Sequence, residues 1–77
     1  PQTRAMEALM MGLRLAEGVN LPALESKTGL AVAEMVDDAE VVKLSGLGFV
    51  DLCDGRLTIQ PKGMPLLDAL LPKIIAL

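Results

Sequence analysis

The sequence has no histidine, tryptophan or tyrosine, and it has only one cysteine, Cys53, and one phenylalanine, Phe49. A structural zinc site or a cysteine-ligated iron–sulfur cluster needs several cysteine or histidine ligands, so this chain alone cannot build either one. A single cysteine also excludes an internal disulfide and is typical of a reducing, cytoplasmic setting. The scarcity of aromatic rings argues against a surface that stacks on bases or sugars.

Long apolar runs are also missing. The stretch Leu66–Leu77 is interrupted by Asp68, Pro72 and Lys73, and it falls short of the roughly 18 continuous apolar residues that a membrane span needs. No signal peptide is recognisable. The net charge is −3, with acids and bases mixed along the chain, which disfavours non-specific attraction to nucleic acid or to an anionic membrane. We therefore expect a cytoplasmic protein without a membrane span.

The chain has 77 residues, near the lower limit for a self-sufficient hydrophobic core. It begins with Pro1 rather than methionine, and its first predicted helix is too apolar for a free-standing domain of this size. We therefore interpret residues 1–77 as a single domain that was excised from a larger protein.

The first predicted helix runs from Arg4 to Glu17, with Thr3 as its N-cap and Gly18 just beyond its end. One helix needs only one apolar stripe to pack on a small core, but this helix has two. The first stripe comprises Met6, Leu9, Met10 and Leu13, and the second comprises Ala8, Met11 and Leu15. Two stripes predict a helix with a neighbour on both sides, one of them outside this chain.

Five residues of this helix form the predicted domain interface. Gly12 lies inside the helix, where glycine costs about 1 kcal/mol relative to alanine. The close approach of another backbone or a ligand would explain this glycine, and so would plain tolerance. Glu7 and Arg14 share a face, so they either form ion pairs with a neighbouring domain or remain solvated. The interface set is Glu7, Met11, Gly12, Arg14 and Leu15.

Caps, turns and periodicity predict the remaining elements. Asn20 caps a second helix, and Asp37 or Asp38 caps a third. Asp54-Gly55 is a strong signal for a tight hairpin. The predicted ranges are helices 21–27, 39–47 and 62–76 and strands 49–52 and 56–59, with Leu30, Val32 and Met35 in a connector that folds onto the core.

The order helix, helix, helix, hairpin, helix is the winged-helix layout. We predict a mainly α fold with a small β-hairpin: a winged-helix-like three-helix core, a hairpin wing and flanking N- and C-terminal helices. Pro72 lies within the range of the last helix and is expected to kink that helix or end it early.

Nucleic-acid binding is the first function that a winged helix suggests, but the charges argue against it. The would-be recognition helix, residues 37–47, has Asp37, Asp38 and Glu40 against one base, Lys43. The hairpin is similar, since it has two acids against Arg56. Phosphates are bound by Lys and Arg, so these net acidic surfaces favour a packing or protein-interaction module.

Catalytic chemistry has little support in the residues. Cys53 lies between Asp51 and Asp54 with no Lys or Arg immediately before it, which favours an ordinary hairpin residue over a reactive thiol or a heme ligand. No carboxylate has a partner arranged for acid–base work. We assign no catalytic, cofactor-binding or metal-ligating residue, and we interpret the five methionines as core filler rather than as a ligand groove.

Two stretches of the chain form recognisable motifs. One is Arg4-x-x-Glu7-x-Leu9-Met10-x-Gly12-Leu13-Arg14-Leu15-x-Glu17-Gly18-Val19. The other is Leu44-x-x-Leu47-Gly48-Phe49-Val50, followed by Leu57-Thr58-x-x-x-x-Gly63-Met64-x-Leu66-Leu67-Asp68-x-Leu70-Leu71. Together they resemble the C-terminal domain of the oxygen-independent coproporphyrinogen III oxidase family over essentially the whole chain. The similarity is greater to the heme-chaperone-like branch than to the true decarboxylating oxidase, although Pro65 and Pro72 depart from the helix-forming residues expected there.

The resemblance implies a radical S-adenosylmethionine protein of porphyrin and heme metabolism. An upstream barrel would hold a [4Fe–4S] cluster on three cysteines and bind S-adenosylmethionine, and chaperone-like members would bind heme. This segment would then be a non-catalytic accessory domain that packs on the barrel of an oxidoreductase-like parent. The residues also leave a second interpretation open, namely a small winged-helix protein-interaction or regulatory module. An isolated domain could self-associate through the exposed stripe of its first helix.

Overall fold

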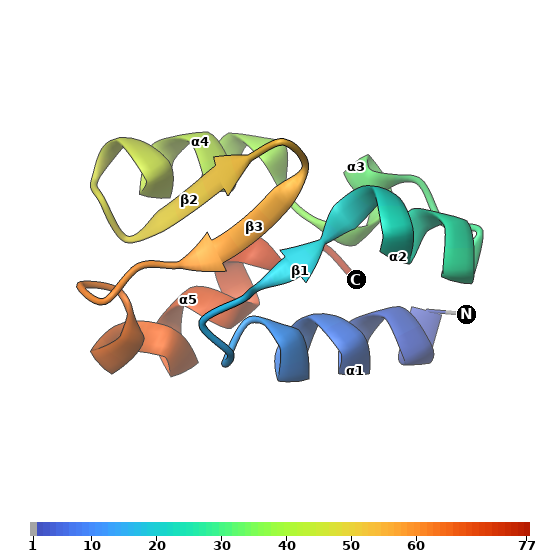
Figure 1. Cartoon of the computed structure of the whole chain (residues 1–77), viewed down its shortest axis with the longest axis horizontal. Helices are drawn as coiled ribbons and strands as arrows, with labels where there is room; N and C mark the ends of the chain where they lie inside the picture. Colours follow the sequence, from blue (N-terminus) through green and yellow to red (C-terminus); the bar gives the residue numbers. More distant parts are fainter. Residues whose placement is uncertain (1) are drawn as a thin grey trace.

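The structure, a computed structural model, describes residues 2–77. Figure 1 shows the elements in chain order. They are α1 (Gln2–Gly12), β1 (Val19–Asn20), α2 (Leu21–Thr28), α3 (Val32–Met35), α4 (Asp38–Gly46), β2 (Val50–Cys53), β3 (Arg56–Ile59), the 3-10 helix η1 (Met64–Leu66) and α5 (Leu67–Ile74). The fold is mainly helical with a small antiparallel sheet, and its hairpin wing follows the helical core as predicted.

The three strands form one sheet in the order β1-β3-β2, and both pairs are antiparallel. Between β2 and β3, Asp54 and Gly55 have φ values of 53° and 81°. Positive φ at both central residues defines a type I′ turn, whose twist matches that of the flanking strands. The predicted hairpin is therefore confirmed, with its first strand shifted one residue toward the C-terminus.

Strand β1 is an element that the sequence pattern did not predict. Two residues are too few for an alternating pattern, and the strand exists because Val19 pairs with Leu57 and Asn20 pairs with Arg56. The side chain of Arg56 reinforces this pairing, since its Nη1 donates to the carbonyl oxygen of Glu17 at 2.9 Å. The third strand is thus a product of long-range contacts.

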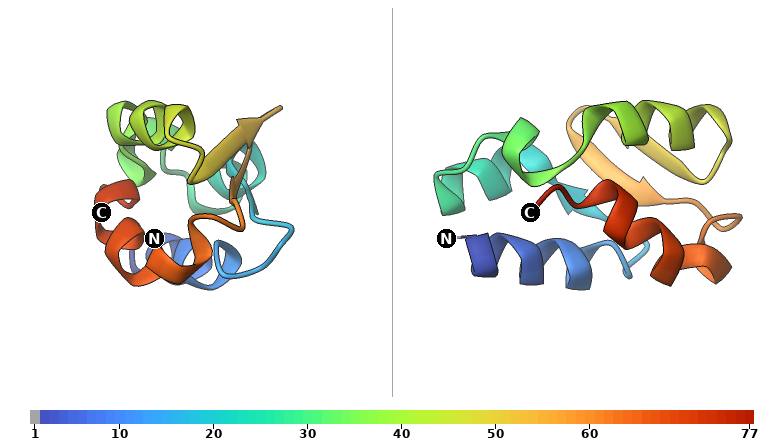
Figure 2. Two further views of the ribbon diagram at one scale, coloured as in Figure 1. Left: turned by 90° about the vertical axis from the view of Figure 1, so that its left-hand side faces the viewer. Right: turned by 180° about the vertical axis from the view of Figure 1, so that it is seen from behind.

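The core lies between the sheet and the helices. Figure 2 shows α1, α4 and α5 grouped around one face of the sheet. Four sheet residues on this face are buried, namely Val19, Val50, Leu57 and Ile59, whereas Leu52 near the hairpin turn stays about half exposed. The largest fully buried side chains are Leu9, Leu13, Met35, Val36, Val50, Leu57 and Ile74, so aliphatic residues and methionine fill the interior. This agrees with a sequence in which only one residue is aromatic.

Helix α1 is shorter at its C-terminus than predicted, ending at Gly12 rather than at Glu17. Thr3 lies inside its first turn and does not cap it, because the helix already begins at Gln2. After Gly12 the chain continues in tight turns, with the N–H of Leu15 donating to Gly12 at 3.1 Å and the N–H of Gly18 donating to Leu15 at 3.0 Å. These turns bring the chain back to pair with β3, and this pairing sets the end of the helix.

Gly18 is required by this return of the chain. Its φ is +68°, and a Cβ on Gly18 would collide with the carbonyl oxygen of Leu57 in β3. The predicted role of Gly18, ending a helix at Glu17, is therefore wrong. Only glycine allows the backbone to approach the strand so closely.

The predicted caps of α2 and α4 are confirmed. The side chain of Asn20 accepts from the N–H of Ala23 at 3.1 Å, and that of Asp37 accepts from the N–H of Glu40 at 3.2 Å. Gly29 ends α2 in the left-handed conformation with φ 75°. The predicted connector contains the short helix α3, and its Met35 is fully buried, as expected for a segment folded onto the core.

The C-terminal part divides into two helices where one was predicted. Pro61 and Pro65 lie near the start of this part, and the 3-10 helix η1 precedes α5, which ends two residues before the predicted end at Ala76. Pro72 is exposed within α5, and the helix continues only to Ile74 beyond it. The last residues then lie beside the segment before α4, with the N–H of Ala76 donating to Met35 at 3.0 Å.

Candidate docking surface

Helix α1 has one buried face and one exposed apolar face. Leu9 and Leu13 are completely buried, and they lie in one row with the equally buried Ala5. On the outer side, Met11 is 69% exposed, and Leu15, in the turn after the helix, is 56% exposed. Met11 and Leu15 are only four positions apart in the chain, so this side of the domain is a candidate contact surface.

Each of the two predicted stripes therefore contains both buried and exposed residues. From the first stripe, Met6 and Met10 remain 36% and 39% exposed and only Leu9 and Leu13 are buried. From the second stripe, Ala8 packs against the core. The flank with Met6 and Met10 borders a groove of about 270 Å³, whose other lining residues are Leu71, Pro72, Ile75 and Leu77.

Gly12 has a neighbour inside this chain. A Cβ on Gly12 would lie 2.5 Å from Cγ2 of Val19, the buried residue that begins β1. The absence of a side chain therefore lets α1 approach β1 closely. The structure itself gives a packing reason for this glycine.

The two charged residues of the predicted interface lie on the surface. Glu7 is exposed. Arg14 Nη2 lies 3.9 Å from Oδ1 of Asp68 at the start of α5, and the two side chains are 52% and 94% exposed. An ion pair this long and this exposed contributes about 0–1 kcal/mol, so the guanidinium is only weakly held by its partner.

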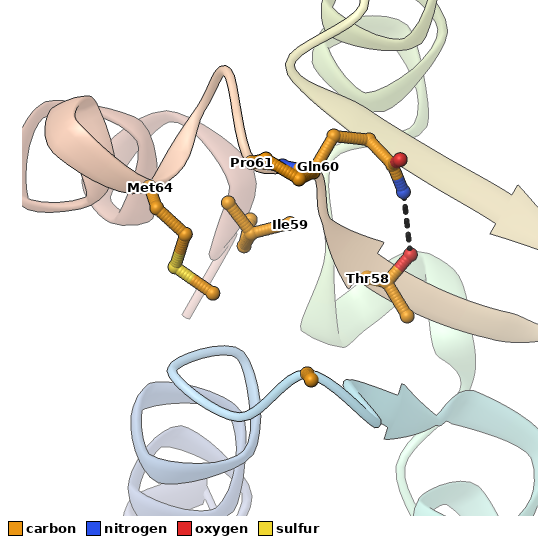
Figure 3. A pocket seen from close by; sticks show the side chains of 6 residues that line it. Thr58, Ile59, Gln60, Pro61 and Met64 are labelled. Atoms are coloured by element: carbon orange, nitrogen blue, oxygen red, sulfur yellow. Dashed lines mark hydrogen bonds between the residues drawn. The ribbon is translucent and has the colours of Figure 1, made fainter.

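A second hollow lies beside this surface and was missed by sequence reasoning. It has a volume of about 470 Å³ and is lined by Ala16, Thr58, Ile59, Gln60, Pro61 and Met64. Figure 3 shows Gln60 turned toward Thr58, and its Nε2 donates to Thr58 Oγ1 at 3.1 Å. The lining residues come from two segments about 40 positions apart in the chain, and they form no motif that is local in the sequence. No sequence signal could therefore have indicated this hollow.

Helix α4, the would-be recognition helix, lies on the side of the molecule opposite α1 (Figures 1 and 2). Its most exposed apolar residue is Val42, at 71%, and Leu47 follows the helix at 50%. Its first turn carries the acids Asp38 and Glu40. Lys62 donates from Nζ to the carbonyl oxygen of Leu47 at 3.0 Å, and this cation is thus engaged at the C-terminal end of α4.

The hairpin and the charged residues do not assemble a metal site within residues 2–77. Cys53 is exposed, and its Sγ lies 3.9 Å from Oδ2 of Asp54. No group of three or more His, Cys, Asp or Glu side chains in this part of the chain is placed to hold a metal ion. Across the same range, every helix is too short or too polar to cross a bilayer.

Comparison with known families gives one match. A family model described as the HemN C-terminal domain matches residues 1–66. This range includes α1, the three strands and η1, and it ends just before α5. No curated protein and no solved structure matches the chain.

Proposed function

Because the chain belongs to the HemN C-terminal domain family, of the oxygen-independent coproporphyrinogen III oxidases, we propose that it docks on the catalytic barrel of its parent protein and is itself non-catalytic. Residues 1–77 are one domain of that larger protein in this proposal. The docking surface in this proposal is the outer face of α1 together with the turn that follows it, with Met11 and Leu15 as its apolar residues and Glu7 and Arg14 as its charged ones. Gly12 serves the internal contact between α1 and β1.

One observation carries the proposal: Met11 on the outer side of α1 and Leu15 in the turn after it stay exposed, while Ala5 and Leu9 on the inner side of the helix are fully buried. Complete burial of such a side chain contributes roughly 1.5–3 kcal/mol, so covering the exposed parts of Met11 and Leu15 would contribute roughly 1–2 kcal/mol each. Such a gain supports docking within one protein, where the partner is always nearby.

The [4Fe–4S] cluster and S-adenosylmethionine of the family belong to the barrel in this proposal. The chain offers one cysteine, Cys53, and no histidine, so its residues do not fit a cluster that needs three cysteines. The three cysteine ligands of such a cluster would therefore lie outside this domain.

The test uses the full-length parent and the substitutions Met11→Asp and Leu15→Asp together. We expect the domain to undock, because two carboxylates cannot be buried against an apolar surface without partners. Undocking is measured as faster protease cleavage at the junction before Pro1 and as faster amide hydrogen exchange in residues 11–16.

Val42→Asp is the matched control, since Val42 is equally apolar and exposed but lies on the opposite side, on α4. It should leave cleavage and exchange unchanged. The proposal fails if the α1 variant behaves like the unmodified parent, or if Val42→Asp releases the domain to the same extent.

Within the family, the motifs at residues 4–19 and 44–71 are more similar to the heme-chaperone-like branch, and the proposal extends to that branch. The parent protein should then bind heme and leave coproporphyrinogen III unconverted. Heme titration followed by absorbance, together with a decarboxylation assay on the reconstituted parent, distinguishes the two branches. Conversion of coproporphyrinogen III would assign the parent to the true oxidases.

The second candidate is a winged-helix interaction or regulatory module, which the exposure of Val42 and Leu47 at α4 favours. The acids in the first turn of α4 oppose phosphate binding there. A gel shift with mixed-sequence DNA at low salt tests the nucleic-acid version, and a shifted band would support it.

A further inference from the structure

We propose that Asp54, in the turn between β2 and β3, is a site of spontaneous isoaspartate formation, and that this modification detaches the turn from helix α2. In this reaction the side-chain carboxyl of an aspartate bonds to the backbone nitrogen of the next residue. The reaction is fastest where that residue is glycine and where the backbone can rearrange. The inference is independent of the proposed docking function.

Asp54 differs from the other four aspartates of the chain in the residue that follows it. It precedes Gly55, which has no side chain to shield its backbone nitrogen. The residues after the other four all have side chains, and they are Asp38, Ala39, Leu52 and Ala69. Three of those four aspartates also lie within α4, β2 and α5, where regular hydrogen bonds hold the backbone. The sequence and the fold together therefore single out Asp54.

The two reacting groups are accessible in the hairpin turn. Asp54 is exposed and Gly55 is partly exposed. The strand pairing ends at Cys53 and Arg56, so both turn residues lie outside the ladder of hydrogen bonds. Within residues 2–77, the N–H of Gly55 donates to no backbone acceptor. The nitrogen of Gly55 is therefore free to react without first breaking a backbone hydrogen bond of its own.

The geometry of the turn keeps this reactive pair in place. Gly55 has φ 81°, and a Cβ on it would lie 2.8 Å from Cδ and Cγ of Pro22, so a side chain at this position is disfavoured twice. Asp54 has φ 53°, a conformation in which type I′ turns prefer asparagine, aspartate or glycine. Asparagine before glycine closes the same ring with loss of ammonia. Only a second glycine would satisfy this turn and remove the reaction.

The reaction needs water and no other reagent. The nitrogen of Gly55 bonds to Cγ of Asp54, and its proton leaves with one carboxylate oxygen and a solvent proton as water, which gives a cyclic imide. Water then adds to the main-chain carbonyl carbon of Asp54, and the bond from this carbon to nitrogen breaks. The nitrogen regains a proton, and the main-chain carbon becomes a free carboxylate. The product has the composition of the original chain, but its backbone runs through Cβ of Asp54.

The extra backbone atom disrupts the contact between the hairpin and α2. A two-residue type I′ turn fits its strands only with one set of backbone angles, which a lengthened turn cannot keep. The carbonyl oxygen of Gly55 accepts from the N–H of Leu21, the first residue of α2, at 2.9 Å. Gly55 also packs on Pro22 in the same helix. A displaced Gly55 loses both contacts, so we expect the start of α2 to become more mobile.

The test incubates the folded chain of residues 1–77 at neutral pH, beside a synthetic peptide of residues 50–59. Samples taken over time are cleaved with an endoproteinase that cuts before aspartate, and the products are analysed by reversed-phase chromatography and mass spectrometry. The isoaspartyl product has unchanged mass, resists cleavage at position 54 and elutes separately. We expect the folded chain to convert at no less than about one tenth of the peptide's rate, since about 1.4 kcal/mol for opening the turn slows the reaction tenfold.

Asp54→Gly is the matched control, because glycine at both central positions suits a type I′ turn and provides no carboxyl group. This variant should yield no isoaspartyl product at the turn. The same new product in Asp54→Gly would overturn the assignment to Asp54. Conversion of the folded chain at less than one tenth of the peptide's rate would overturn it as well, because the fold would then protect the pair.

Amide hydrogen exchange tests the detachment from α2. The converted chain is separated from the unmodified one by ion-exchange chromatography, and protection is compared at two amides. We expect Leu21 to lose protection after conversion. Gln60 should keep it, because its N–H donates to Phe49 at the other end of the hairpin, at 2.9 Å. Equal protection of Leu21 in both chains would refute the detachment.

Discussion

Helix α5 lies beyond the range of the family match, yet we predict that the domain cannot fold without it. Four of its eight residues belong to the core: Leu67, Leu70, Leu71 and Ile74. Replacing a buried leucine or isoleucine by alanine costs about 2–5 kcal/mol. Loss of four such side chains costs roughly 8 kcal/mol even at the lower end, whereas a core of this size supplies only about 5 kcal/mol or less.

The experiment compares residues 1–77 with residues 1–66 by far-ultraviolet circular dichroism and urea unfolding. The longer chain should unfold in one cooperative transition, and the shorter chain should show none. Ile74→Ala gives a graded version, because Ile74 is completely buried, and it should lower the unfolding free energy by about 2–5 kcal/mol. Lys73→Ala, at an exposed position of α5, should change it by less than about 0.5 kcal/mol. A cooperative transition of residues 1–66 at the same midpoint would refute this reasoning.

Two glycine substitutions should have opposite effects on the urea midpoint. Gly18→Ala should destabilise the domain by about 1–3 kcal/mol or more, because φ at Gly18 is +68° and a Cβ would collide with Leu57; an unchanged midpoint would contradict the close approach of the two strands. Gly46→Ala should stabilise it by about 0.5–1 kcal/mol, because Gly46 lies in α4 and its Cβ would meet nothing within 4 Å; a lowered midpoint would show a neighbour that the structure does not contain.

Local chemistry made some elements predictable. The Asp54-Gly55 turn and the Asn20 cap each depend on residues within three positions, so the sequence states them directly. The end of α1 could not be read in this way, because it depends on Val19 pairing with Leu57, 38 positions later. The apolar residues keep their helical spacing through Leu13 and Leu15, so the pattern gives no sign that the helix ends at Gly12. Only the pairing of β1 with β3 explains this end.

The candidate site shows the same division. Helical periodicity located Met11 and Leu15 on a side away from the core, and the structure leaves both exposed. Periodicity assigned Met6 and Met10 to the buried stripe, but α5 and the last residues leave this flank open as a groove. The hollow beside Ala16 could not be predicted from the sequence, because its lining residues come from segments that are distant in the chain.

The sheet order leaves β2 at an edge, with β3 as its partner in the described part of the chain. An edge strand of four residues presents backbone groups to which a strand of another molecule could add, and Leu52 is half exposed there. The exposed carboxylate of Asp51 lies within this strand. Charge on an edge opposes such pairing, so the carboxylate of Asp51 disfavours the addition of a further strand to β2.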